Sequence, residues 1–298
     1  MIYSDIIKWY MQNDVKREIV DFSLERWIAI HCEARDDKGN QLFLRYWSRS
    51  EKPITIASVK DFERIFSKLQ KCKPRTFYVT ANQYYRLHDI GDTMDLRNIK
   101  KCMPTWDIDN EFQKWETTIE VAKLIVEFLY RMGIEKSVFV KWSGNGAHVH
   151  INPMAFSSEI TSKINPLDIA YAIVEYVNTK LRQKYIEIAE KHKASELKVE
   201  NKMDAKRVFT CPLSIHREVD RVAICIDPEK LENFDPTWTR PETYNHYTEW
   251  RRYEEGEGDK LAKIAFETIG PCPYLGSGKR RKRKGTRPDE IIRKFLKM

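Results

Sequence analysis

The order of secondary-structure signals in the middle of the chain constrains its fold more than any other feature. Apolar residues there alternate as in strands or recur at helical spacing, in the order strand, helix, strand, strand and helix. The segments are 106–109, 117–132, 137–142, 147–151 and 166–194. Gly133 suits the end of the first helix, Pro166 suits the start of the second, and residues 143–146 favour a tight turn between two strands.

This β-α-β-β-α order predicts an α+β fold with an RRM-like antiparallel sheet and helices on one face. We expect this core to span residues 101–230 and to include one more buried strand at 222–226. A separate αβ module is expected over residues 1–100 and a polar, partly helical extension over 231–275. Residues 276–298 are expected to form a basic flexible tail with a short helix.

The first hundred residues show weaker patterns, which predict two helices and three strands. The helices are expected at 4–12 and 59–69 and the strands at 26–32, 41–47 and 76–80. Residues 36–40 suit a hairpin turn between the first two strands, whereas residues 81–100 are polar and are expected to be irregular.

The net charge of +8 is concentrated in one place. Six consecutive basic residues carry most of it: Lys279, Arg280, Arg281, Lys282, Arg283 and Lys284. Removing these six charges leaves only +2 for the rest of the chain. The tail is therefore a candidate nucleic-acid-binding arm, with a partner-docking segment and a solvated charged stretch as the alternatives.

The remaining composition narrows the setting. No apolar run approaches the roughly 20 residues that a membrane-spanning helix needs, and the N-terminus lacks the pattern of a signal peptide. We therefore expect a soluble, cytoplasmic protein with no membrane partner. The six cysteines show no C-x-x-C spacing, so neither a disulfide framework nor a zinc module is expected.

The first chemical motif is the pair Asp107 and Asp109 at the end of a strand. Residues i and i+2 of a strand point to the same face, about 6–7 Å apart along the backbone. Two carboxylates so placed repel each other unless cations lie between them, and Mg²⁺ and Mn²⁺ prefer oxygen ligands. The bland alternative is a solvated strand end.

The second motif is the hairpin Ser143–His148 and the strand that follows it. The glycines, Gly144 among them, let backbone N–H groups approach phosphates, and Ser143 adds a hydroxyl donor. His148 and His150 share one face of the strand, where an imidazole can bind triphosphate oxygens. A hairpin with one packed and one exposed histidine is the structural alternative.

The third block begins at Asp204, and Arg207, Ser214 and His216 follow it. It combines a hard-metal ligand with phosphate binders, because arginine grips a phosphate with two N–H groups and serine and histidine add further donors. By spacing alone, a polar loop that enters a strand explains the block better than a binding site does.

Together the three blocks resemble the catalytic subunit of archaeo-eukaryotic primases and the related primase-polymerases. That family has D-x-D, then S-G-x-x-G-x-H or a variant, then a hydrophobic residue followed by Asp, then an R-(x)-P-x-S-x-H-like stretch. The corresponding segments here are Asp107–Asp109, Ser143–His148, Met203–Asp204 and Arg207–His216. An early Arg17-Glu18 pair is also similar, so the resemblance covers roughly residues 15–227.

The resemblance implies template-directed nucleotidyl transfer with two Mg²⁺ or Mn²⁺ ions on Asp107, Asp109 and Asp204. It also implies that the incoming NTP or dNTP is held by Ser143, Gly144, His148, Arg207, Ser214 and His216. The implied partners are a single-stranded or gapped DNA template and, beyond it, a primase large subunit or other replication or repair proteins.

Two other functions stay open from the sequence. His148-Val149-His150 also fits the His-hydrophobe-His metal motif of HUH-type replication initiators and relaxases, which nick single-stranded DNA through a tyrosine nucleophile. The candidate nucleophiles are Tyr171, Tyr176 and Tyr185. A non-catalytic RNA- or DNA-binding module would instead stack bases on Trp106, Phe139 and Trp142.

Overall fold

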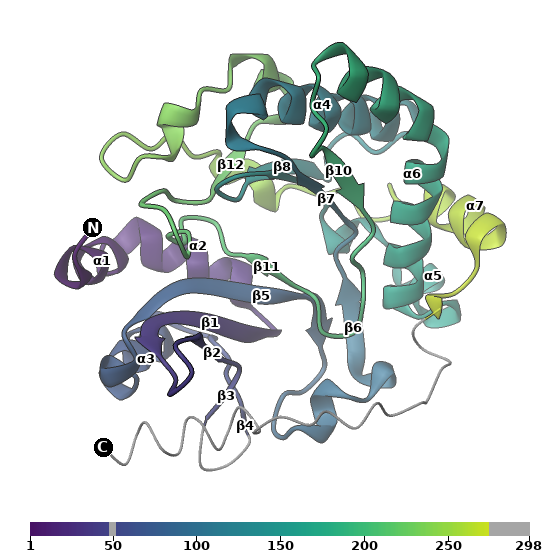
Figure 1. Ribbon diagram of the computed structural model, residues 1–298. Coiled ribbons are helices and arrows are strands. Elements are labelled where there is room, and N and C mark those ends of the chain that lie inside the picture. The colour runs from purple at the N-terminus through teal and green to yellow at the C-terminus, as the bar shows by residue number, and fades with distance from the viewer. Residues whose placement is uncertain (48–51, 274–298) are drawn as a thin grey trace. The chain divides into compact units, whose positions relative to one another are not determined.

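The computed structural model describes residues 1–47 and 52–273, and this part of the chain divides into two compact units (Figure 1). The first unit contains Met1–Lys100 and Val208–Asp220, and the second contains Lys101–Arg207 and Arg221–Pro273. Both units combine helices with antiparallel sheets, which confirms the α+β class. The basic tail and its expected short helix lie outside the described residues.

The first unit is built on a sheet with the strand order β11-β5-β1-β2, to which β6 adds by pairing with β5. Its helices are α1 (Tyr3–Tyr10), α2 (Asn13–Ser23) and α3 (Val59–Lys68), with short 3-10 turns η1 (Gln70–Cys72), η2 (Gly91–Thr93) and η3 (Leu96–Asn98). Its strands are β1 (Arg26–Arg35), β2 (Gln41–Leu44), β3 (Tyr46–Trp47), β4 (Lys52–Pro53), β5 (Pro74–Tyr84), β6 (Ile99–Cys102) and β11 (Val208–Thr210).

An aromatic cluster forms the core of this unit. Tyr10 of α1 packs its ring against Phe62 and Phe66 of α3 and against Phe77 of β5, with ring centroids 5.1 to 5.9 Å apart. The Tyr10 hydroxyl also accepts a hydrogen bond from the Ile215 N–H at 2.9 Å. These contacts join the helices to the sheet and hold the returning segment 208–220 against it.

Two features of the first unit differ from the sequence expectations. Helix α2 was not predicted, although Val15, Ile19 and Phe22 form a buried stripe at nearly helical spacing. Residues 81–100 are less irregular than expected, because β5 continues to Tyr84 and β6 begins at Ile99. In both places polar residues between the apolar positions obscured the pattern.

The second unit contains a five-stranded antiparallel sheet with the order β10-β7-β9-β8-β12. Its strands are β7 (Thr105–Asp109), β8 (Val138–Trp142), β9 (Ala147–Ile151), β10 (Lys198–Glu200) and β12 (Ile224–Ile226). Its helices are α4 (Trp115–Arg131), α5 (Ser158–Lys163), α6 (Pro166–Lys191) and α7 (Asp259–Ile269), and the 3-10 turns are η4 (Phe112–Lys114), η5 (Pro153–Ala155), η6 (Pro228–Asn233), η7 (Pro236–Thr239) and η8 (Thr248–Arg251).

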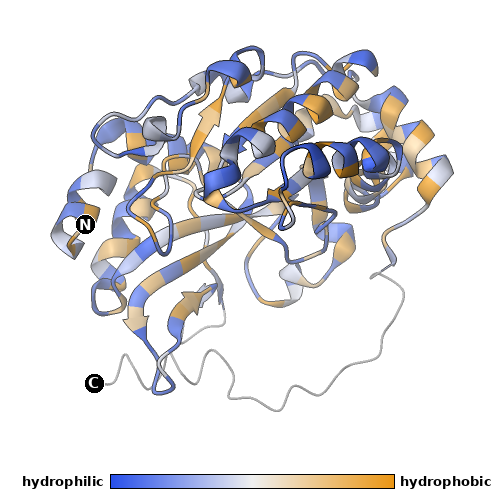
Figure 2. Ribbon diagram, turned by 45° about the horizontal axis from the view of Figure 1, so that its top comes forward, coloured by the Kyte–Doolittle hydropathy of each residue, from blue (hydrophilic) through white to orange (hydrophobic). Residues whose placement is uncertain are grey.

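The chain order of this unit explains the RRM-like sheet. The strands β7, β8, β9 and β10 follow one another in the sequence and lie in the order fourth, first, third, second, which confirms the predicted topology. Helices α4 and α6 pack together and cover one face of the sheet (Figure 1). They carry hydrophobic and hydrophilic residues in alternating bands (Figure 2), as expected of helices with one side on a sheet.

Candidate active site

A row of polar side chains crosses the sheet of the second unit. In successive strands, Glu200 lies opposite Asp107, Asp107 opposite His148, His148 opposite Lys141, and Lys141 opposite Cys225. Directly opposed residues of antiparallel strands project to the same face of a sheet. The fold therefore places two carboxylates, an imidazole and an ammonium side by side.

The polar row lies on the sheet face away from α4 and α6. Ile108, Val149 and Val140 alternate with the row residues along their strands and are fully buried. Because successive strand residues point to opposite faces, these apolar side chains face the helices. The sheet thus separates an apolar face, which stabilises the unit, from a face on which charge is concentrated.

Three carboxylates meet at a single ammonium group. Lys202 Nζ lies 3.0 Å from Asp107 Oδ2, 2.7 Å from Asp109 Oδ2 and 2.9 Å from Glu200 Oε2. The strand spacing explains this convergence, since Asp107 and Asp109 share a face of β7 and Glu200 is the β10 partner of Asp107. One positive charge here reduces the repulsion between three negative ones.

Asp107 is the most enclosed member of this carboxylate cluster. Its side chain is only 5% exposed, and His148 Nε2 lies 3.1 Å from its Oδ1, while Arg207 pairs with its Oδ2. Burial by itself would raise the pKa of Asp107, but the His148 hydrogen bond and the charges of Arg207 and Lys202 hold that pKa well below its usual range. Asp107 is therefore ionised at neutral pH.

Burial acts on His148 in the opposite sense. It lowers the pKa of this imidazole, although the neighbouring Asp107 carboxylate opposes the shift, and the charges of Lys141 and Arg207 add to it. A neutral ring can donate its Nε2 proton to Asp107 without carrying a charge. The nearby His150 is held differently, because its Nδ1 lies 2.8 Å from Thr105 Oγ1 and its ring stacks on Phe139.

The hairpin between β8 and β9 reaches the cluster only because of one glycine. A Cβ atom on Gly146 would lie 2.3 Å from the Ile108 carbonyl oxygen of β7, far inside van der Waals contact. Ser143 and Gly144 lie in the turn, where the Ser143 hydroxyl donates to the Gly146 carbonyl at 3.2 Å and Gly144 has a φ of 131°. Glycine at 146 therefore permits the close approach of the turn to the carboxylate strand.

The structure places Asp204 differently from the other two predicted metal ligands. Its Oδ1 accepts a hydrogen bond from the Lys206 N–H at 2.6 Å, which shapes the turn that leads to Arg207. Glu200, which the sequence reading had not selected, instead joins Asp107 and Asp109 around Lys202. The assignment of Asp204 as a metal ligand stays a prediction, and the geometry adds Glu200 as a competitor for that role.

Ser214 and His216 belong to the first unit, where both have local partners. The Ser214 hydroxyl accepts a hydrogen bond from the Phe77 N–H at 2.8 Å and is fully buried. His216 Nδ1 accepts from the backbone N–H groups of Glu218 and Val219 at 3.2 and 3.3 Å. The Nε2 of His216 therefore carries the ring proton, which makes it a donor. Their roles in nucleotide binding stay predictions.

Sequence reasoning missed three residues of the site: Lys141, Glu200 and Lys202. Lys141 is a fully buried charge within an otherwise apolar strand, and this break in the apolar pattern was the signal for it. Glu200 and Lys202 are two residues apart in a polar stretch, so only the pairing of β10 with β7 reveals that they meet Asp107.

The carboxylate cluster fits a hard divalent cation by the chemistry of its donors. All three side chains that surround Lys202 offer carboxylate oxygens, which Mg²⁺ and Mn²⁺ prefer. Within residues 1–47 and 52–273 no group of three or more His, Cys, Asp or Glu is already spaced to hold a metal ion. The oxygens stand 2.7 to 3.0 Å from the ammonium nitrogen, whereas Mg²⁺ needs about 2.1 Å. Metal binding therefore requires Lys202 to leave and the carboxylates to draw in by under 1 Å.

The geometry weighs against both alternative functions. Trp106, Phe139 and Trp142 are at most 2% exposed, so they are core residues and do not form a base-stacking surface. The tyrosines considered as nucleophiles lie on α6, which covers the sheet face opposite His148. Tyr185 donates its hydroxyl proton to Asn178, and burial raises its pKa above the usual range, which disfavours the nucleophilic phenolate.

The fold and the polar row define an α+β protein with a charged site on an RRM-like sheet. The chain is similar in structure to the polymerase domain of Ligase D from Mycobacterium tuberculosis, solved in complex with DNA, with a TM-score of 0.56 over 90% of each chain. The two share 15% sequence identity, so this likeness shows the fold.

Comparisons by sequence assign this chain to no family. No protein-family model matches this chain, and no curated protein matches it either. Within the described residues, no helix combines the length and the apolar character that crossing a membrane requires.

Proposed function

We propose that this protein is a metal-dependent nucleotidyltransferase that adds nucleotides to a strand on a DNA template, as a primase or primase-polymerase does. The observation that carries the proposal is the convergence of Asp107, Asp109 and Glu200 on one cationic position beside His148 and Lys141. The structural likeness to a polymerase domain in complex with DNA supports the same class of activity.

The three carboxylates would hold the metal ions, with Lys202 as their counter-ion before metal binds. Bound Mg²⁺ or Mn²⁺ would supply Lewis-acid activation of a 3′-hydroxyl and neutralise charge on the leaving pyrophosphate. The protein's own part is to fix the carboxylates, and Asp107 is fixed most firmly because His148 and Arg207 both hold it.

The other end of the polar row suits the triphosphate. His148 lies next to Asp107 across the sheet, and Lys141 lies next to His148; both offer N–H donors. Arg207 offers a guanidinium that can bind a phosphate with two N–H groups. His148 and Arg207 are paired with Asp107 before substrate binds, so triphosphate binding would exchange these partners. The backbone N–H groups of the 143–146 turn would add neutral donors.

We propose a single-stranded or gapped DNA template and an NTP or dNTP as the substrates. A primase large subunit or other replication or repair proteins are the partners that a primase role predicts. The assay described next distinguishes primer synthesis from primer extension and identifies the preferred sugar.

The test is incorporation of labelled NTPs and dNTPs on a defined template, with and without a primer, in Mg²⁺ or Mn²⁺. We expect template-dependent products from the wild-type protein and none from Asp107→Asn. A second lane series without nucleotides looks for a covalent protein–DNA adduct on single-stranded DNA. An adduct without incorporation would support the strand-nicking function and refute the polymerase proposal.

A further inference from the structure

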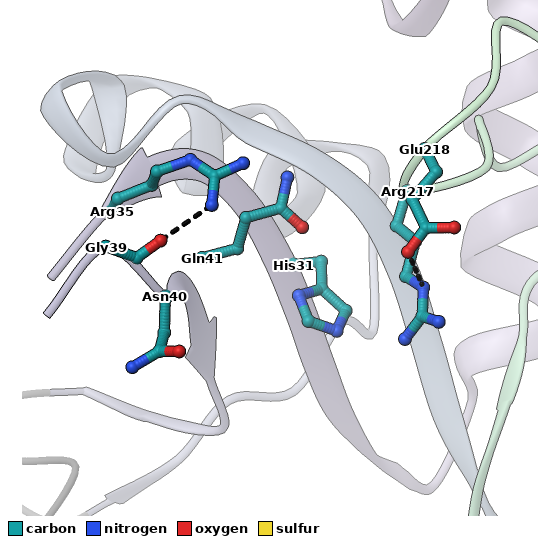
Figure 3. Close-up of a pocket in the computed structure, with 7 residues that line it drawn as sticks. All are labelled: His31, Arg35, Gly39, Asn40, Gln41, Arg217 and Glu218. Carbon is teal, nitrogen blue, oxygen red and sulfur yellow. Dashed lines mark hydrogen bonds and ion pairs between the residues drawn. The ribbon is translucent and has the colours of Figure 1, made fainter.

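A second polar pocket lies within the first unit and has no part in the carboxylate cluster. It is an open hollow with a volume of about 570 Å³. Its lining comes from the β1–β2 hairpin and from the segment after His216: His31, Arg35, Gly39, Asn40, Gln41, Arg217 and Glu218 (Figure 3). The pairing of His31 with Phe43 and of Arg35 with Gln41 fixes which hairpin residues share this face.

An aromatic group supports one side of the pocket. The His31 ring packs on Phe43 at 4.7 Å and on Tyr78 at 5.7 Å between ring centroids, and these two rings are 6.1 Å apart. Burial, with a smaller effect from the Arg217 charge, lowers the pKa of His31 to about 4. The ring is therefore neutral at pH 7 and presents an uncharged aromatic surface, which suits stacking with a nucleobase.

Hydrogen bonds within the protein do not account for the position of the His31 ring. Its Nδ1 is buried and has no hydrogen-bond partner among the described residues. A polar side chain packed in this way has a cost that the fold itself does not offset. Beside it, the Gln41 side chain supplies an amide that can pair with a base edge.

Two guanidinium groups flank the pocket. Figure 3 shows Arg35 on one side of His31 and Gln41, and Arg217 on the other. Arg35 donates to the Gly39 carbonyl at 2.6 Å and has no carboxylate partner in the described part of the chain. Arg217 is 49% exposed, and its one ion pair among residues 1–47 and 52–273 is a surface pair with Glu218 at 3.2 Å. With a neutral His31, these residues carry a net charge of +1.

We infer that this pocket binds one nucleotide unit of a single-stranded nucleic acid, with the base against His31 and the flanking phosphates on Arg35 and Arg217. Separated cations on either side of an aromatic ring match the phosphate–base–phosphate order along a strand. A net charge of +1 is too small to balance a free triphosphate, which favours a strand as the occupant. The choice of a DNA strand rests on the proposed function.

The experiment measures binding of a fluorescent 20-nucleotide oligo(dT) to the full-length protein by anisotropy, in EDTA and over a range of salt. The first test variant is the double substitution Arg35→Ala/Arg217→Ala. A separate variant, Phe43→Leu, weakens the aromatic support. Lys38→Ala is the matched control, since Lys38 is an exposed cation in the same hairpin that does not line the pocket. Circular dichroism and melting temperature check that each variant is folded.

We expect the double variant to bind roughly tenfold more weakly, with a salt slope smaller by about 1.4, or about 0.7 for each lost phosphate contact on a single strand. Phe43→Leu should weaken binding a few-fold with an unchanged slope, because stacking is uncharged. Lys38→Ala should stay within about twofold of wild type. Unchanged binding in the double variant, or an equal loss in Lys38→Ala, would overturn the inference.

A competition arm separates a strand from a free nucleotide. If dTTP in EDTA displaces the oligonucleotide at concentrations near that of the protein, the pocket is a nucleotide site and the strand assignment fails. Failure of the proposed function is read separately, from the incorporation assay. Loss of binding in the pocket variants of a protein that shows no incorporation would retain the strand site and reject the polymerase.

Discussion

The sheets of the two units are both antiparallel, but they carry charge in different ways. In the second unit, Asp107 is enclosed by Lys202, Arg207 and His148, so each charge has a partner. In the first unit, Arg35 lies at an open pocket and has no carboxylate partner among the residues that the structure describes. A cluster of paired charges can exchange its internal cation for metal ions, whereas an unpaired cation at a surface suits reversible binding of an anion.

The largest effect is expected at the centre of the paired cluster. Asp107→Asn removes the negative charge that Lys202, Arg207 and His148 all contact, and incorporation should fall by roughly 10³-fold or more because metal positioning is lost. The nearly isosteric amide limits damage to packing. Incorporation assays measure the loss, and a melting curve shows whether the variant is folded. A folded variant with near wild-type incorporation would refute the metal assignment.

The next effect distinguishes the two candidates for the third carboxylate. Glu200→Gln should lower incorporation by about 100-fold and raise the Mg²⁺ concentration required, because Glu200 contacts the same Lys202 ammonium as Asp107 and Asp109. Asp204→Asn, the matched control, should cost less than about tenfold, since the amide oxygen can still accept from Lys206. The reverse order of effects would restore Asp204 as the third ligand.

A smaller change is expected from removing the internal cation. Lys202→Ala frees the three carboxylates from an ammonium that occupies the position of a metal ion, so half-maximal incorporation should need several-fold less Mn²⁺ or Mg²⁺. Lys202→Arg keeps the charge and should stay close to wild type in this titration. A higher metal requirement in Lys202→Ala would instead indicate that Lys202 contributes to substrate binding.

The smallest effect is a change in the free energy of unfolding, and it compares one glycine in a hairpin of each unit. Gly146→Ala should lower the free energy of unfolding by about 1–3 kcal/mol, because the new Cβ overlaps the Ile108 carbonyl. Gly39→Ala has open space around its Cβ, and its cost of about 1 kcal/mol should come only from its positive φ of 79°. Urea denaturation measures both. An equal or larger loss in Gly39→Ala would show that the turn near Asp107 tolerates a side chain.

Much of the fold was readable because its elements have strong local patterns. The helix expected at 117–132 is α4 (Trp115–Arg131), and Gly133 follows it with a φ of 88°. The long helix from Pro166 is α6, ending at Lys191. Helix α2 was missed because polar residues lie between its apolar positions, and the return of residues 208–210 to pair with β5 depends on a partner more than 120 residues away.

The candidate site was readable in part for the same reason. Asp107 and Asp109 can be recognised by their period-two spacing within one strand, and the Ser143–His148 turn can be recognised by its glycines. Glu200 has no such local signature, because its place beside Asp107 follows from strand pairing between segments about ninety residues apart. Lys202 was equally hidden, since its three ion pairs exist only after that pairing forms.

The sequence alone determined the α+β class, the RRM-like order of the central elements and the residue types available for metal and phosphate binding. Local periodicity and turn chemistry act over a few residues, so they can be recognised in the sequence without knowledge of the tertiary contacts. The tertiary structure decided which carboxylates share a cation and that Trp106, Phe139 and Trp142 are core residues. It also placed an aromatic and cationic pocket on the β1–β2 hairpin. These features depend on contacts between distant segments, which local patterns do not specify.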